Sequence, residues 1–131
     1  MRLKVAVNKN CVNKENPQKV ASGWKNVIVD LNWLMGWVGS GYGWCATHFT
    51  DRYRKADNAD GSNCVVIDFD GDTSLHSFWA TTTAKEWCAA TYTSASHTTA
   101  KNRFRAIFPL EKELTSPGQH KAAYWLVVDR L

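Results

Sequence analysis

The sequence predicts an α/β (α+β) domain, and three stretches carry this prediction. The apolar run "CVVIDFD" at 64–70 is typical of a buried strand, central in its sheet. "RFRAIFPL" at 103–110 alternates as a strand does, and Pro109 is expected to limit it. Ser116 followed by Pro117 is typical of a helix start, and apolar residues follow at three-residue steps: Ala122, Trp125, Val128 and Leu131.

Residues 1–63 are predicted to form an N-terminal α/β segment of one domain that covers 1–131. "LKVAV" is a candidate first strand. Ser22 is a candidate N-cap, because apolar residues follow it at helical spacing: Trp24, Val27, Ile28, Leu31, Leu34, Met35 and Val38. "GSGYG" at 39–43 is expected to end that helix. A strand "WCATHF" and a polar loop at 50–63 are expected to follow.

Residues 64–131 are predicted to form an incomplete RRM-like unit. After the strand at 64–70 we expect a short helix within 72–86, capped by an Asp or Thr. The Thr-rich stretch at 87–96 and then 103–110 favour two strands, followed by the C-terminal helix. This β-α-β-β-α order lacks the last strand of a β-α-β-β-α-β unit.

Composition restricts the class of protein only loosely. The chain has 16 basic and 12 acidic residues, and its net charge of +4 permits a nucleic-acid or phosphate partner without requiring one. We expect no membrane association and a cytoplasmic location, because the sequence has neither a long apolar run nor the apolar core of a signal peptide. The cysteines lack metal-binding spacing and are interpreted as ordinary thiols: Cys11, Cys45, Cys64 and Cys88.

Acidic, imidazole and guanidinium side chains recur at the ends of the predicted strands. Asp68 and Asp70 share one face of a strand and could hold Mg²⁺ or Mn²⁺ together with substrate phosphates. His97 follows the next strand, and Arg103 and Arg105 share a face of the third, where guanidinium groups suit triphosphate oxygens. Each feature alone is equally explained without a function, for example as an acidic turn or a solvated face. Their conjunction in three consecutive strands favours a site.

The stretches "VVIDFDGD" and "YTSASHTTAKNRFRAIFPL" resemble the archaeo-eukaryotic primase superfamily. The closer similarity is to the primase-polymerase domains of plasmid, phage and cyanobacterial replication proteins. The resemblance covers about residues 40–131. It matches the family's acid-x-acid motif at Asp68 and Asp70, and its small-x-His motif at "ASH", which ends at His97. It implies that the acids bind catalytic divalent metals, and that His97 and basic residues such as Arg103 and Arg105 hold the incoming nucleotide.

The sequence departs from this family at the third motif, an acid on a later strand. Asp129 is the only late candidate, and its helical setting argues against it. A chain that ends before that strand, as a truncated frame, a fragment or a decayed copy, would bind metal weakly. The activity of this chain is therefore in question even within the family.

The resemblance implies template-directed nucleotidyl transfer, as a DNA primase or polymerase, in the replication of a plasmid, phage or mobile element. The expected partners are a single-stranded DNA template, an NTP or dNTP, and a helicase domain or protein. Template phosphates could be contacted by Arg52, Arg54 and Lys55, which an exposed basic loop would equally explain. Aromatic residues could stack on unpaired bases or simply pack in the core: Trp33, Trp37, Tyr42 and Trp44.

Two alternatives remain open at this point. The first is a single-stranded nucleic-acid-binding module without catalysis, which would not need Asp68 or Asp70. The second is a phosphatase, because "DFDGDT" resembles the haloacid-dehalogenase motif, with Asp68 as nucleophile and Asp70 as general acid. Asp72 interrupts that motif, and the phosphatase would leave His97 without a role.

Overall fold

The computed structural model describes residues 1–11, 21–55, 57, 59–94, 97–98 and 101–131. Its helices and antiparallel sheets confirm the predicted α/β class. The chain divides into two compact units. The first unit contains Met1–Cys64 and Glu111–His120, and the second contains Val65–Leu110 and Lys121–Leu131.

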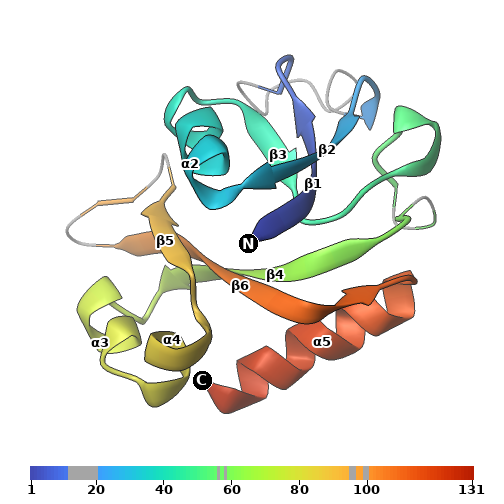
Figure 1. The fold of residues 1–131 in the computed structure, drawn as a ribbon. Helices are drawn as coiled ribbons and strands as arrows, with labels where there is room; N and C mark the ends of the chain where they lie inside the picture. Colours follow the sequence, from blue (N-terminus) through green and yellow to red (C-terminus); the bar gives the residue numbers. More distant parts are fainter. Residues whose placement is uncertain (12–20, 56, 58, 95–96, 99–100) are drawn as a thin grey trace. The chain divides into compact units, whose positions relative to one another are not determined.

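The first unit is built on a three-stranded antiparallel sheet (Figure 1). β1 (Arg2–Asn8) lies in the middle, between β2 (Lys25–Asp30) and β3 (Gly43–Cys45). The strand predicted at "LKVAV" is confirmed by β1. Its side chains are almost all buried, as expected of a central strand.

The prediction of a helix from Ser22 onward is wrong for the first half of that segment. Residues 25–30 form β2, in which Val27 lies opposite Val5 of β1. Three consecutive β-branched residues, 27–29, favour a strand, and pairing with β1 decides the ambiguity. The helix α2 (Leu31–Gly39) begins only after Asp30, whose side chain accepts a hydrogen bond from the Trp33 amide at 2.8 Å.

After α2, the predicted end of the helix is confirmed, whereas the strand that follows is shorter than predicted. Ser40 caps the helix, and Gly41 adopts a φ of 84°, which glycine tolerates best. β3 is shorter than the predicted strand at 44–49, and Phe49 forms only an isolated bridge with Ala59. The polar loop holds a single tight turn at Thr50–Arg52, and its residues 56 and 58 lie outside the described part.

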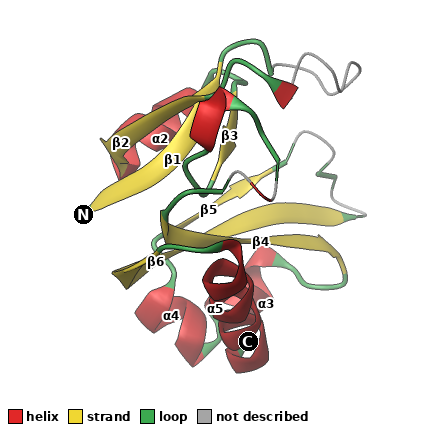
Figure 2. Ribbon diagram, turned by 90° about the vertical axis from the view of Figure 1, so that its right-hand side faces the viewer, coloured by secondary structure: helices red, strands yellow, loops and turns green. Residues whose placement is uncertain are grey.

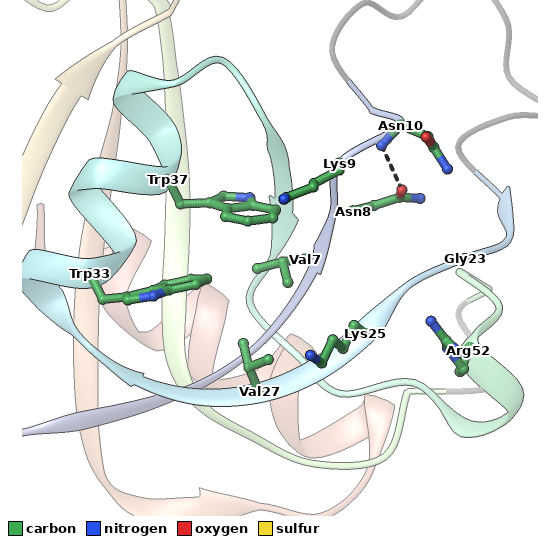
Figure 3. Close-up of a pocket in the computed structure, with 10 residues that line it drawn as sticks. All are labelled: Val7, Asn8, Lys9, Asn10, Gly23, Lys25, Val27, Trp33, Trp37 and Arg52. Atoms are coloured by element: carbon green, nitrogen blue, oxygen red, sulfur yellow. Dashed lines mark hydrogen bonds between the residues drawn. The ribbon is translucent and has the colours of Figure 1, made fainter.

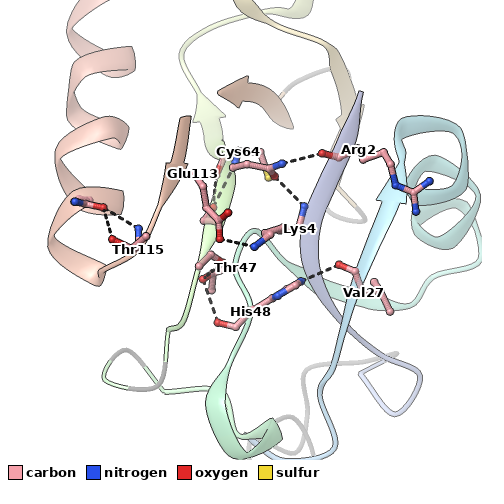
Figure 4. A network of polar contacts seen from close by, with 12 residues as sticks. Arg2, Lys4, Val27, Thr47, His48, Cys64, Glu113 and Thr115 are labelled. Carbon is pink, nitrogen blue, oxygen red and sulfur yellow. Dashed lines mark hydrogen bonds and ion pairs between the residues drawn. The ribbon is translucent and has the colours of Figure 1, made fainter. Parts of the chain in front are cut away.

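Within the first unit, polar contacts join β1 to segments far away in the sequence (Figure 4). Lys4 forms an ion pair with Glu113. The Asn63 side chain accepts a hydrogen bond from the Lys4 amide and donates one to the Arg2 carbonyl, both at 2.8 Å. These contacts join segments that the sequence separates by more than fifty residues.

The second sheet contains β4 (Ser62–Gly71), β5 (Ala90–Thr93) and β6 (Asn102–Leu114), in the order β4-β6-β5. The last strand in the chain therefore lies between the first two, as in a split βαβ unit. β4 was expected to be central, but it lies at the edge of the described sheet. Both faces of its apolar stem are nevertheless buried, at Cys64, Val65 and Ile67. β4, β6 and α5 (Pro117–Arg130) each run from one unit into the other.

Two helices occupy the region where one was predicted: α3 (Leu75–Trp79) and α4 (Thr82–Trp87). The side chains of Ser74 and Thr81 accept the N-terminal amide hydrogen bonds. Asp72 was expected to cap this region, and it does not. The extended backbone of Thr81 explains the division into two helices.

The core of the second unit lies between one face of the sheet and the helices (Figures 1 and 2). Phe78 packs edge-on against Phe104 and Phe108. From α5 the side chains of Ala123, Tyr124 and Val127 join this core. The three-residue series predicted for α5 is therefore only partly right: Val128 packs against this core, whereas Ala122 and Trp125 are exposed.

Pro109 does not end its strand, because β6 continues to Leu114. The pairing with β5 covers only Phe104 to Ile107, so Pro109 lies beyond it. A residue without an amide proton is tolerated where one side of a strand needs no donor. The start of α5 is as predicted: the Gln119 amide donates to the Ser116 hydroxyl at 3.2 Å.

Candidate functional site

The acids of β4 lie on the face of the sheet that is opposite the helices. Ile67 and Phe69 pack with the helical core, so the alternating Asp68 and Asp70 point to the other face. Their side chains are 70% and 62% exposed, respectively. A hydrated ion or a phosphate group can therefore reach both carboxylates.

Each of these acids is matched with an arginine of β6. Arg105 Nε donates to Asp68 Oδ1 at 2.5 Å, and Arg103 Nε lies 3.1 Å from Asp70 Oδ1. The partners step in opposite directions along their strands, as side chains of antiparallel neighbours do. The predicted sharing of a face by 68 and 70, and by 103 and 105, therefore places four charges together.

Two residues that the sequence did not single out complete the cluster. Lys101 Nζ lies 3.8 Å from Asp70 Oδ1. Arg105 Nη1 donates to the Tyr92 hydroxyl of β5 at 3.3 Å. Lys101 continues the i, i+2 series of Arg103 and could have been found by that spacing, whereas Tyr92 depends on the register between β5 and β6.

His97 is held against the same strand by its ring. The Arg103 amide donates to Nδ1 at 3.1 Å, and the His97 amide donates to the Ser94 carbonyl at 3.0 Å. Because Nδ1 accepts, the proton of the neutral imidazole lies on Nε2 and can be donated to a ligand oxygen. Ala95 and Ser96, the first two residues of the small-x-His motif, lie outside the described residues.

The cluster carries an excess of positive charge. Three cationic side chains face two carboxylates, so one positive charge remains when His97 is neutral. Burial acts to lower the pKa of Arg105, but its contacts with Tyr92 and Asp68 outweigh burial and leave the pKa above its usual value. The guanidinium is thus permanently charged, and a polyanion can compete with the carboxylates for it.

The donor set fits a divalent metal only in part. Among the described residues, no group of three or more His, Cys, Asp and Glu side chains is arranged to hold a metal ion. Asp68 and Asp70 alone match the one or two carboxylates by which Mg²⁺ binds when phosphates supply further oxygens. Asp129, the doubtful third carboxylate, lies exposed on α5 and not on a strand.

The basic loop residues belong to the first unit and not to this cluster. Arg52 Nε donates to the Trp24 carbonyl at 3.1 Å. The Arg54 guanidinium lies 5.7 Å from the centre of the Trp24 ring, in cation–π geometry. Lys55 is exposed. The expectation that all three contact phosphates therefore stays a prediction, with Arg52 and Arg54 already engaged by Trp24.

Two of the four cysteines are unsuited to act as nucleophiles. All four are free thiols. Burial raises the pKa of Cys64 to about 12 and, more than its backbone hydrogen bonds lower it, that of Cys88 to about 11. Neither thiol is appreciably ionised at neutral pH, which excludes both as activated nucleophiles.

None of the helices in the described residues combines the length and apolar character needed to cross a membrane.

The cluster on β4 and β6 is the candidate site to which both the sequence and the geometry point. Comparison with known proteins gives no family model, no curated protein and no solved structure that matches this chain.

Proposed function

We propose that the face carrying Asp68, Asp70, His97, Arg103 and Arg105 binds the triphosphate of an incoming nucleotide. The proposed reaction is template-directed nucleotidyl transfer, as in the primase-polymerase domains that the sequence resembles. The observation that carries the proposal is the matched pairing of Asp68 with Arg105 and of Asp70 with Arg103 on one exposed face. Positioning and charge neutralisation are the main requirements of phosphoryl transfer.

The ion pairs give the site a way to accept a metal-bound nucleotide. Without nucleotide, the arginines neutralise carboxylates that would otherwise repel one another. When a nucleotide binds, its phosphate oxygens replace the carboxylates as partners of Arg103 and Arg105, and Asp68 and Asp70 turn to the cation. Mg²⁺ or Mn²⁺ would there neutralise charge on the reacting phosphate.

His97 and Lys101 complete the proposed contacts. The Nε2 proton of His97 would be donated to a phosphate oxygen, while Nδ1 remains on the Arg103 amide. Lys101, already close to Asp70, would add a cation to the outer side of the triphosphate. In this proposal, the chain's own side chains bind and orient the triphosphate.

The test is incorporation of labelled dNTPs and NTPs on a primed and an unprimed single-stranded template with Mn²⁺. Asp68→Ala, Asp70→Ala, His97→Ala and Arg105→Ala should each reduce incorporation by at least tenfold. Asp72→Ala and Asp129→Ala change exposed acids outside the cluster and should retain parental incorporation. Equal incorporation by the parent and all cluster variants would reject the site.

A second candidate function is a single-stranded nucleic-acid-binding module without catalysis. The excess of positive charge on the cluster, where three cationic side chains face two carboxylates, favours it. It predicts salt-dependent binding of single strands that Asp68→Ala does not weaken, together with no incorporation by the parent. The phosphatase alternative is not proposed, since it gives no role to His97 or to the two matched arginines.

A further inference from the structure

The first unit contains a pocket that the proposed nucleotidyl transfer does not use (Figure 3). The pocket has a volume of about 330 Å³, at the lower end of the range for small-molecule sites. Trp33 and Trp37 of α2 approach it from one side, and Val7 of β1 and Val27 of β2 lie across from them. One wall is therefore aromatic and the opposite wall aliphatic.

The aromatic wall is preformed. The rings of Trp33 and Trp37 are stacked, with centroids 5.2 Å apart and an interplanar angle of 15°. Trp37 Nε1 donates to the Gly43 carbonyl at 2.9 Å, which fixes the inner ring. Trp33 is 42% exposed, so its ring remains accessible to a ligand. A flat, unpaired base is a suitable partner for such a surface.

The polar rim of the pocket is cationic. Lys9, Lys25 and Arg52 line it, and none of the described lining residues is acidic. Within the described part of the chain, neither Lys9 nor Lys25 has a carboxylate in ion-pair distance. This charge excludes a cationic ligand of the kind that aromatic cages bind, and it favours an anion.

Arg52 is held at the pocket by an unusual backbone. Asp51 and Arg52 have φ values of 57° and 55°, in the left-handed region that L-residues seldom adopt. The Arg52 carbonyl accepts from the Trp24 amide at 3.2 Å, and Arg52 Nε donates to the Trp24 carbonyl at 3.1 Å. Such backbone conformations persist where the surroundings enforce them, and they cluster at ligand sites.

We infer that this pocket binds one nucleotide of a single-stranded nucleic acid. The base would stack on the face of the Trp33 ring that Trp37 does not cover, and the adjoining phosphates would contact Lys9, Lys25 and Arg52. Aromatic stacking combined with a basic track is the usual means of binding single strands without sequence preference. The inference goes beyond nucleotidyl transfer, because binding here requires neither a divalent metal nor Asp68.

The test is fluorescence anisotropy of a labelled oligothymidylate with the full chain, in EDTA and without nucleotide. Trp33→Ala should weaken binding about tenfold or more, since a stacked base contributes that much to affinity. Lys25→Ala should weaken binding and lower the slope of log Kd against log salt by about 0.7. Circular dichroism spectra and melting temperatures of the variants establish that they are folded.

Three controls make the result specific. Trp125→Ala removes an exposed tryptophan of α5, and Lys112→Ala removes an exposed lysine of β6; both should bind as the parent does. A duplex of the same length should bind more weakly, because its bases are not available for stacking. Asp68→Ala should retain full binding, which separates this site from the proposed catalytic one.

Parental affinity in both Trp33→Ala and Lys25→Ala would overturn the inference. Equal loss in Trp125→Ala, or equal affinity for duplex and single strand, would also overturn it. Failure of the incorporation assay would leave this inference standing, whereas failure here would leave the cluster on β4 and β6 untouched.

Discussion

The backbone of Gly43 packs directly against the side chain of Cys11. A Cβ atom at position 43 would stand 2.5 Å from the Cys11 sulfur and 2.6 Å from its Cβ. Only glycine allows β3 to approach that closely while its carbonyl accepts the hydrogen bond from Trp37. The first unit, and with it the tryptophan wall of the pocket, therefore depends on this residue.

We expect Gly43→Ala to lower the free energy of unfolding by about 1–3 kcal/mol, as overpacking does. Gly36→Ala is the matched control, since its added Cβ would meet no atom within 4 Å and alanine favours a helix interior. It should raise the free energy of unfolding by about 0.5–1 kcal/mol. Urea titration measures both. A Gly43→Ala protein as stable as the parent would show that the contact with Cys11 relaxes without penalty.

Asp68→Asn should leave stability nearly unchanged while it removes the charge required by the proposed site. The Asp68 side chain is 70% exposed, and exposed ion pairs contribute only about 0.2–1 kcal/mol. The free energy of unfolding should therefore fall by less than about 1 kcal/mol. A loss of several kcal/mol in urea titration would mean that the pair with Arg105 is a structural requirement of the sheet.

The stability of the protein should fall between neutral and mildly acidic pH because of His120. Burial lowers the pKa of this imidazole more than the backbone of Cys64 raises it, and Nε2 is buried without a hydrogen-bond partner among the described residues. The unfolded chain, in which a histidine titrates near 6.5, binds the proton at higher pH than the folded chain. The free energy of unfolding is thus highest above that pH and decreases as the pH falls through it.

Unfolding measured from pH 7.5 to 5 for the parent and for His120→Gln tests this expectation. The variant should lose part of the pH dependence, whereas His76→Gln, at an exposed position, should keep it. An identical pH profile in the parent and His120→Gln would contradict the assignment.

The thiols should differ in reactivity. Cys64 is fully buried, and both its pKa and that of Cys88 are raised by burial, to about 12 and about 11. A thiol reagent at pH 8 should therefore modify Cys11 and Cys45 first and Cys64 only after unfolding. Peptide mapping by mass spectrometry identifies the sites. Modification of Cys64 in the folded protein at the rate of Cys11 would refute this order.

Ser116→Ala should lower the free energy of unfolding by about 1 kcal/mol, because the hydroxyl caps α5. Ser22→Ala is the informative counterpart. The sequence made Ser22 a helix cap, but the structure places it in an isolated bridge with Tyr53. Its replacement should change stability by less than about 0.5 kcal/mol. Thermal unfolding of the two variants compares the predicted cap with the observed one.

Local pattern predicted the fold where one local signal dominated. The start of α5 at Ser116 and the end of α2 near Gly41 follow from capping and glycine chemistry. The prediction was wrong for residues 25–30, because their apolar spacing fits a helix while their β-branched side chains fit a strand. Only the pairing of Val27 with Val5, twenty-two positions earlier, decides between them.

In the candidate site, too, local pattern predicted some features, whereas others depend on pairing between distant residues. Strand periodicity predicted that Asp68 and Asp70 share a face, and that Arg103 and Arg105 do. It could not supply the register that sets each acid opposite its own arginine, since register depends on the packing of both strands. The left-handed backbone of Arg52 is likewise invisible in the sequence, because no glycine or asparagine marks the position.

The continuity of β4, β6 and α5 across the two units has a consequence for how this chain can be cut or recombined. A gene break between residues 63 and 64 would remove Ser62 and Asn63 from β4. It would also place Glu113 on a different polypeptide from its ion-pair partner Lys4. The first piece would lose the ion pair between Lys4 and Glu113, and the second would lose the start of β4. A fusion or recombination point placed within β4, β6 or α5 would therefore cut an element that both units share.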